Sequence, residues 1–180
     1  MSTKTQNTNS KRILYYAIGF TVAFALYIAS ILTPAGSCFS VETGSNSLGL
    51  SFSYTKDIVQ NFLESRTEEQ LLCYSQFLQI WDAIFAIIYT LMYASWIVYL
   101  FNNKSWLALI PVLGMVSDWS ENYVELLMIK AYLNAAPISD ELVSIGSGIN
   151  SFKWVLSSLT YLIILFGIII AIRNFFAKPR

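Results

Sequence analysis

Residues 117–125 place several polar side chains on what would be a single face of a helix. Asp118, Glu121, Asn122 and Glu125 follow one another at i, i+3, i+4 and i+7. Side chains at these intervals lie on the same side of an α-helix. Carboxylates grouped in this way can bind a hard cation, exchange protons with a ligand, or form a hydrogen-bonded network.

The chain around this stretch is unusually apolar. Of its 180 residues, 56% are hydrophobic and 12% are charged, and the mean hydropathy is +0.55. Soluble domains have about a quarter of their residues charged, so these values predict an integral membrane protein. The formal net charge is zero, which gives no reason to expect binding to nucleic acid.

The sequence contains no histidine. It therefore cannot form His-ligated haem, the usual catalytic zinc sites, Glu-x-x-His di-iron sites or imidazole-based catalytic triads. We assign no catalytic residue and expect no cofactor. Whether the carboxylates bind a metal is left open, because they can bind Mg²⁺, Ca²⁺ or Mn²⁺ without histidine.

Four segments are long and apolar enough to cross a bilayer, which takes about 20 residues of helix. They cover about residues 13–32, 77–101, 106–132 and 152–172, and Thr33-Pro34 ends the first. The first could be read as a signal peptide, but its apolar run exceeds the ~7–15 residues of a signal core. We therefore expect an uncleaved helix and one all-α domain, residues 1–180, folded as a four-helix transmembrane bundle.

Lysine and arginine placement predicts the orientation. The N-terminal tail, the loop "NNKS" and the C-terminal tail have basic residues and no acidic ones: Lys4, Lys11, Arg12, Lys104, Arg173, Lys178 and Arg180. The opposite side is mainly acidic: Glu42, Asp57, Glu64, Glu68, Glu69, Asp140 and Glu141, against Lys56, Arg66 and Lys130. We expect a multi-pass protein of the cell membrane, specifically a bacterial inner membrane, with both termini cytoplasmic.

The loop 33–76 should form a small extracytoplasmic cap. Its segment "TKDIVQNFLESR" has a helical apolar face made of Ile58, Val59, Phe62 and Leu63. The pair Thr67 and Gln70 has the spacing of a capping box, which predicts a helix running unbroken into the second span. The amphipathic helix is expected to cap the bundle or to lie on the membrane surface.

Cys38 and Cys73 flank this loop at similar height. An oxidising compartment would allow a structural disulfide, and closing the loop would stabilise the fold by about 3–4 kcal/mol on the loop-entropy estimate. A redox-active pair and two free thiols are the alternatives.

The carboxylates are expected in the outer half of the membrane. At 1.5 Å per residue, Asp118, Glu121 and Glu125 lie ~18, ~22 and ~28 Å from the cytoplasmic end of their helix. The second and fourth spans bring further polar groups to this level. The predicted ligand or ion pocket consists of Asp82, Tyr89, Asp118, Glu121, Asn122, Glu125 and Lys153.

Lipid cannot surround these groups, because a mid-membrane Asp costs about 2.5–3.5 kcal/mol. They must face the bundle interior, where Asp82, Asp118, Glu121 and Glu125 outnumber Lys153. Protons, a cation, a lipid amine or a partner chain would balance the charge. The pocket could also be a purely structural hydrogen-bonded network.

The chain resembles a group of small uncharacterised bacterial four-span membrane proteins over about residues 48–126. These combine an F-x-Y-[ST] loop, a D-x-x-F-x-x-x-Y helix and a D-x-x-E-N helix. The matching residues are Phe52, Tyr54 and Thr55, then Asp82, Phe85 and Tyr89, then Asp118, Glu121 and Asn122. The resemblance implies that the polar face belongs to the pattern of that group, and it supplies no activity.

Three functions remain open on these grounds. The first is a non-enzymatic membrane component that assembles with itself or with larger membrane partners, with the acidic pocket as interaction or ligand site and membrane lipid as a partner. The second is a cation- or proton-linked carrier of a small molecule or lipid. The third is a carboxylate-based intramembrane enzyme.

The orientation can be tested by cysteine labelling of whole cells. In a background with Cys38→Ser and Cys73→Ser, an impermeant maleimide should label Glu69→Cys and leave Lys104→Cys unlabelled until the membrane is opened. Labelling of position 104 in intact cells would reverse the predicted orientation.

Overall fold

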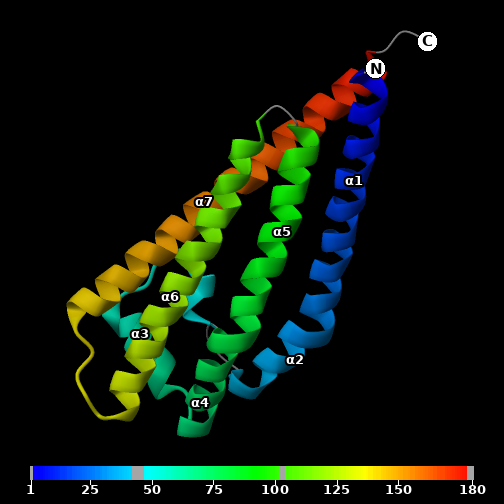
Figure 1. Cartoon of the computed structure of the whole chain (residues 1–180). Helices are drawn as coiled ribbons and strands as arrows, with labels where there is room; N and C mark the ends of the chain where they lie inside the picture. The colour runs from blue at the N-terminus through cyan, green and yellow to red at the C-terminus, as the bar shows by residue number, and fades with distance from the viewer. Residues whose placement is uncertain (1, 42–46, 102–103, 178–180) are drawn as a thin grey trace.

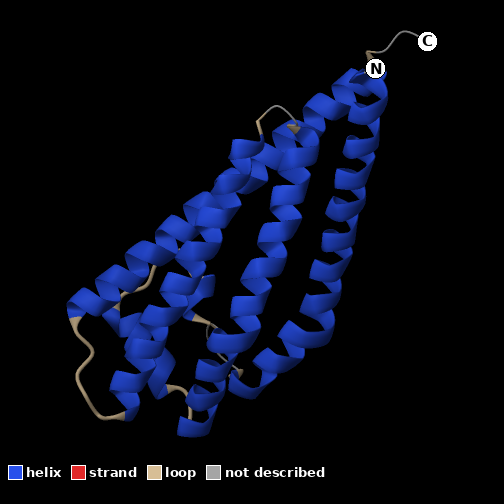
Figure 2. Ribbon diagram, in the orientation of Figure 1, coloured by secondary structure: helices blue, strands red, loops and turns tan. Residues whose placement is uncertain are grey.

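A computed structural model describes residues 2–41, 47–101 and 104–177, and this part of the chain is helical, with no strand (Figures 1 and 2). The charged residues Glu42, Lys178 and Arg180 lie outside it. The long helices are α1 (Ser2–Tyr27), α5 (Ala83–Leu100), α6 (Leu109–Leu133) and α7 (Asp140–Phe176). The start of α1 and the end of α7 lie at one end of the bundle, and the segments between α1 and α5 gather at the other (Figure 1).

The first apolar helix continues through its expected end. A π-helical turn at Ile28–Leu32 follows α1, then α2 (Thr33–Gly36) and a 3₁₀ turn at Ser37–Phe39. The prediction that the helix stops at Thr33-Pro34 is wrong. Pro34 lies at the first positions of α2, and Thr33 N–H donates to Ile28 O in a π-type bond. The wider π-helical turn before it shifts the hydrogen-bond pattern, which accommodates a proline that has no N–H to donate.

The second helical stretch runs from Glu68 to Leu100, as predicted. It comprises α4 (Glu68–Gln76), a π-helical segment at Phe77–Asp82 and α5. The capping box before it is confirmed, because Gln70 N donates to Thr67 Oγ1 at 3.2 Å and Thr67 N donates to Gln70 Oε1 at 3.0 Å. This stretch carries Asp82 at the point where the π-helical segment meets α5.

Three described stretches are long and apolar enough to cross a membrane: Lys11–Phe39, Glu68–Leu100 and Asp140–Phe176. After a 3₁₀ turn at Ser105–Ala108, α6 has a similar length of 25 residues. The helix α6 is not one of these three apolar stretches, because it carries four charged residues, Asp118, Glu121, Glu125 and Lys130. It packs against α5 and, most extensively, α7, whereas α1 packs on α5 (Figure 1). Its polar face is therefore covered by other helices.

The last helix begins earlier than expected. It starts at Asp140, where the Ser139 side chain accepts from Leu142 N at 3.1 Å, so the predicted start at 152 is wrong. The Ser- and Gly-rich stretch before 152 forms helix because its inner side is buried at Val143, Gly146 and Asn150. Packing against α6 thus overrides the low helix propensity of glycine.

The main hydrophobic core lies at the end of the bundle opposite the chain's start. The helix α3 (Lys56–Glu64) contributes Val59, Phe62 and Leu63, which are buried. Ile58 was expected beside them but is 44% exposed, because it lies towards the outer edge of the apolar stripe. These residues pack with side chains from α4, α6 and α7, including Leu71, Tyr74, Phe77, Met128, Ile129 and Val143.

Cys38 and Cys73 lie at disulfide-bonding distance, with their Cα atoms 6.4 Å apart. The Arg66 guanidinium adds a second connection, because its Nε donates to Phe39 O at 3.1 Å and its Nη1 to Phe62 O at 2.8 Å. Burial lowers the pKa of Arg66 from its ordinary value. Together these contacts connect the end of the first helical stretch to α3 and α4.

Two glycines on α7 provide a matched test of this packing. A Cβ at Gly146 would lie 2.5 Å from the Tyr54 hydroxyl and 2.9 Å from Val124, whereas a Cβ at Gly148 would meet nothing within 4 Å. We expect Gly146→Ala to destabilise the protein by about 1–3 kcal/mol through overpacking. Gly148→Ala should be neutral or stabilising by up to about 1 kcal/mol. Thermal unfolding in mild detergent measures both, and equal effects would contradict the close α6–α7 approach.

Candidate functional site

The polar face of α6 points into the bundle. Asp118 and Asn122 are 6% exposed, Glu125 is 1% exposed and Glu121 is fully buried. The intervening Trp119 is 40% exposed, on the outward side of the helix. The spacing i, i+3, i+4 and i+7 therefore brings all four polar side chains to the buried side.

Lys153 on α7 meets this face. Its ammonium lies 3.1 Å from Asp118 Oδ1 and also donates to Glu121 Oε2. It points towards the backbone of the 3₁₀ turn Leu48–Leu50 as well, with Nζ 3.4 Å from Gly49 O. Its side chain is 12% exposed, so one ammonium is shared by two nearly dehydrated carboxyl groups on the neighbouring helix.

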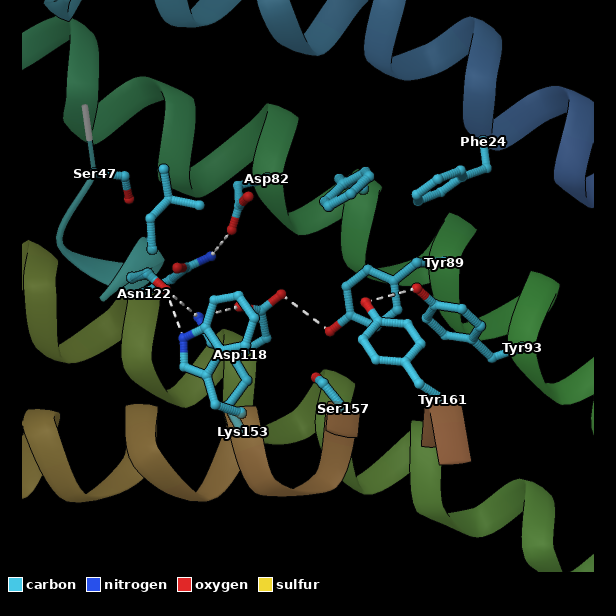
Figure 3. Close-up of a pocket in the computed structure, with 14 residues that line it drawn as sticks. Phe24, Ser47, Asp82, Tyr89, Tyr93, Asp118, Asn122, Lys153, Ser157 and Tyr161 are labelled. Carbon is cyan, nitrogen blue, oxygen red and sulfur yellow. Dashed lines mark hydrogen bonds and ion pairs between the residues drawn. The ribbon is translucent and has the colours of Figure 1, made fainter. Parts of the chain in front are cut away.

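The second helical stretch supplies Asp82 and Tyr89. Asn122 Nδ2 donates to Asp82 Oδ2 at 2.7 Å, and Tyr89 OH donates to Asp118 Oδ2 at 3.0 Å (Figure 3). Asp82 thus has an amide as its hydrogen-bond partner, whereas Asp118 has both an ammonium and a phenol. The structure brings these groups together from three different helical stretches.

Glu125 lies in a separate part of the network. Its Oε2 accepts from the hydroxyl of Tyr74, which also lies 2.9 Å from Ser47 Oγ. Tyr74 was missed in the sequence, although it lies two helical turns before Asp82 and so on nearly the same face. Asn150 was also missed, and it donates to Ser51 O.

Tyr54, which is 4% exposed, is a further group that the pocket prediction left out. The signal for it was the F-x-Y-[ST] motif. Burial raises the pKa of its phenol far above the ordinary value, and the nearby carboxylates of Glu125 and Glu121 raise it further. The hydroxyl therefore keeps its proton and is available as a hydrogen-bond donor.

A cavity of about 180 Å³ opens on one side of this network (Figure 3). It lies between α1, α5, α6, α7 and the turn before α3. Its lining residues are Phe24, Ser47, Gly49, Leu50, Asp82, Phe85, Tyr89, Tyr93, Asp118, Asn122, Lys153, Trp154, Ser157 and Tyr161. Glu121 and Glu125 do not line it, so the expected single pocket divides into an open cavity and a buried cluster behind it.

The network is best suited to hydrogen bonding and charge pairing. Among the described residues, no group of three or more His, Cys, Asp or Glu side chains is arranged to hold a metal ion. The four carboxylates face only the ammonium of Lys153 within the network. The site therefore has more carboxyl groups than cationic groups, and two of the carboxyls, Asp82 and Asp118, line the cavity.

Comparison with protein-family models, with curated proteins and with solved structures gives no match. The resemblance to small bacterial four-span proteins stays a prediction, and the function must be argued from the site.

Removing the lysine should harm the fold more than removing an acid. We expect Lys153→Ala to cost on the order of 3–5 kcal/mol, because Asp118 and Glu121 would stay buried without their counter-charge. Asp118→Asn should cost little, because the amide keeps the shape and one acceptor while reducing the excess negative charge. Thermal melts in detergent at neutral pH measure both.

The matched control is Lys56→Ala. Lys56 forms an exposed ion pair with Asp140 at 2.8 Å, with the two side chains 47% and 80% exposed, and such pairs contribute at most about 1 kcal/mol. If Asp118→Asn unfolds the protein while Lys153→Ala behaves like Lys56→Ala, then Lys153 does not neutralise the buried carboxylates.

Proposed function

We propose that the chain is a non-enzymatic four-span component of a bacterial inner membrane, in which the cavity binds the cationic head group of a lipid-like molecule. Both termini are cytoplasmic, and α3 with its neighbours caps the outer end. The three apolar stretches support this reading. So does α6, whose polar face is covered by α5 and α7 and which is long enough to be the fourth span.

The composition of the cavity wall carries the proposal. The carboxylates of Asp82 and Asp118 share the cavity wall with six aromatic side chains and with Lys153, whose ammonium is already paired with Asp118. An ammonium group is attracted both by carboxylates and by the faces of aromatic rings, the latter by up to about 2 kcal/mol when dehydrated. A cationic head group would also supply positive charge to a network of four carboxyl groups and one lysine.

The size and the position of the cavity indicate an amphiphile. A space of about 180 Å³ holds a head group with a few carbons and not a whole lipid. Tyr161 on its wall is 51% exposed and accepts a hydrogen bond from Tyr93 at 3.0 Å. Exposed apolar residues such as Leu162 and Leu165 follow Tyr161 on α7, so an acyl chain leaving the cavity could lie along this helix.

The same apolar surface allows assembly. Large apolar side chains are exposed along α1 and α7, among them Tyr15, Val22, Leu26, Phe166 and Ile169. Lipid tails, a second copy or a larger membrane partner would all cover such a surface. The proposed ligand site does not depend on whether lipid, a second copy or a larger partner covers this surface.

Lipid binding can be measured by thermal stabilisation in mild detergent. Phosphatidylethanolamine, which has an amine, should raise the melting temperature of the wild-type protein, and phosphatidylglycerol, which has none, should not. Asp82→Asn should lose most of the response, because it removes the carboxylate that no ammonium neutralises. The matched control Asp57→Asn, an exposed acid on α3, should respond like the wild type.

Native mass spectrometry of the same samples provides a second readout. Amine-containing lipid should co-purify with the wild type and with Asp57→Asn, and be depleted in Asp82→Asn. Equal stabilisation by both lipids, or equal retention in all three proteins, would rule out recognition of an amine in the cavity.

A further inference from the structure

Behind the cavity, four buried polar atoms have no hydrogen-bond partner among the residues that the structure describes: Tyr54 OH, Glu121 Oε1, Glu125 Oε1 and Asn150 Oδ1. All four residues are at most 4% exposed. Buried polar groups are normally paired, and each exception calls for an explanation.

These atoms belong to one neighbourhood. Glu121 and Glu125 lie on successive turns of α6, and side chains four residues apart on a helix are neighbours. The Tyr54 hydroxyl lies against Gly146 on α7, where a Cβ would be 2.5 Å away. Asn150 is one turn further along α7, on the same side of the helix.

In each glutamate and in Asn150, the other polar atom already has a partner. Glu121 Oε2 accepts from Lys153, Glu125 Oε2 accepts from Tyr74, and Asn150 Nδ2 donates to Ser51 O. The four remaining atoms comprise three acceptors and one hydroxyl. The hydroxyl can donate to one acceptor, such as Asn150 Oδ1. The two carboxylate oxygens, Glu121 Oε1 and Glu125 Oε1, are then left without a hydrogen.

We propose that Glu121 and Glu125 hold one proton in common, as a buried pair of a carboxylic acid and a carboxylate. A single hydrogen between the two Oε1 atoms satisfies both of them. It also removes the repulsion between two negative charges on successive turns of one helix. No other group needs to move.

A proton fits this place better than a metal ion. Glu121, Glu125 and Asn150 line neither the cavity beside Asp118 nor the two clefts beside Lys56, whereas a cation needs a space surrounded by oxygen ligands. A proton needs only two oxygen atoms within hydrogen-bonding reach.

The pair is connected to the cavity through Lys153. Its ammonium bridges Glu121 in the buried pair and Asp118 on the cavity wall. A cation that binds beside Asp118 would weaken the interaction between this carboxylate and the Lys153 ammonium. The ammonium would then interact more strongly with Glu121 and Glu125. The added positive charge would favour release of the shared proton, and by linkage proton release would favour the cation. Only this step rests on the proposed function.

The groups that would modulate the pair come from every element packed around it. The titratable ones facing it are Tyr54, Tyr74, Asp82, Asp118 and Lys153. Of these, only Lys153 is positively charged.

Infrared spectroscopy of the purified protein tests the shared proton directly. A protonated carboxyl has a carbonyl-stretching band that ionised carboxylates lack. The band should be present at neutral pH in the wild type and in Asp57→Asn, and should be lost in Glu125→Gln and in Glu121→Gln. A wild type without the band, or an undiminished band in the two glutamine variants, would overturn the proposal.

Stability against pH gives a second measurement. If the folded protein binds one more proton than the unfolded chain, stability must fall as the pH rises. Glu125→Gln replaces the shared proton by an amide hydrogen, so its melting temperature should fall less than that of the wild type between neutral and alkaline pH. Parallel falls in the two proteins would contradict the pair.

The link to the cavity is tested by adding phosphatidylethanolamine in weakly buffered detergent with a pH indicator. Wild-type protein should release up to one proton per bound lipid, and Glu125→Gln none. Lipid binding without release would overturn the link and leave the lipid site standing. Absence of lipid binding together with the infrared band would overturn the proposed function and leave the pair standing.

Discussion

The arrangement of the polar site depends on one ammonium group placed between two helices. Lys153 on α7 reaches Asp118 and Glu121 on α6, and these are the two helices that pack most extensively against each other. In a dehydrated environment an unpaired carboxylate is costly, so this pairing fixes the rotation of α6 about its axis. With that rotation set, Asn122 can reach Asp82, and Tyr89 can reach Asp118.

The end of the bundle that contains α3 and α4 holds this arrangement in place. Tyr74 contacts Glu125 from α4, and the backbone of the turn at Gly49 lies near Lys153 and Trp154. Cys38 and Cys73 lie at disulfide-bonding distance. The long connection between the first two apolar stretches is therefore more than a linker, because its side chains and backbone contact the polar network at one end of the bundle.

The network divides into two parts with different access. Asp82 and Asp118 line the cavity, where a ligand can neutralise them. Glu121 and Glu125 are closed off behind it, so their charge can be neutralised only by a proton or by a neighbouring side chain. Lys153 belongs to both parts, which is why the charge in the cavity and the protonation of the pair are expected to depend on each other.

The sequence by itself determined the helical class, the apolar stretches and the polar face of α6, because each follows from local composition or from the 3.6-residue period. Even Lys153 and Tyr89 could be placed at the right level by counting residues along each helix. The tertiary structure alone decided that the glutamates are sealed from the cavity and that Tyr54 and Asn150 join them. It also decided that α7 starts at Asp140 and that the first helix passes Pro34. These features depend on contacts between residues distant in the chain, which no local period records.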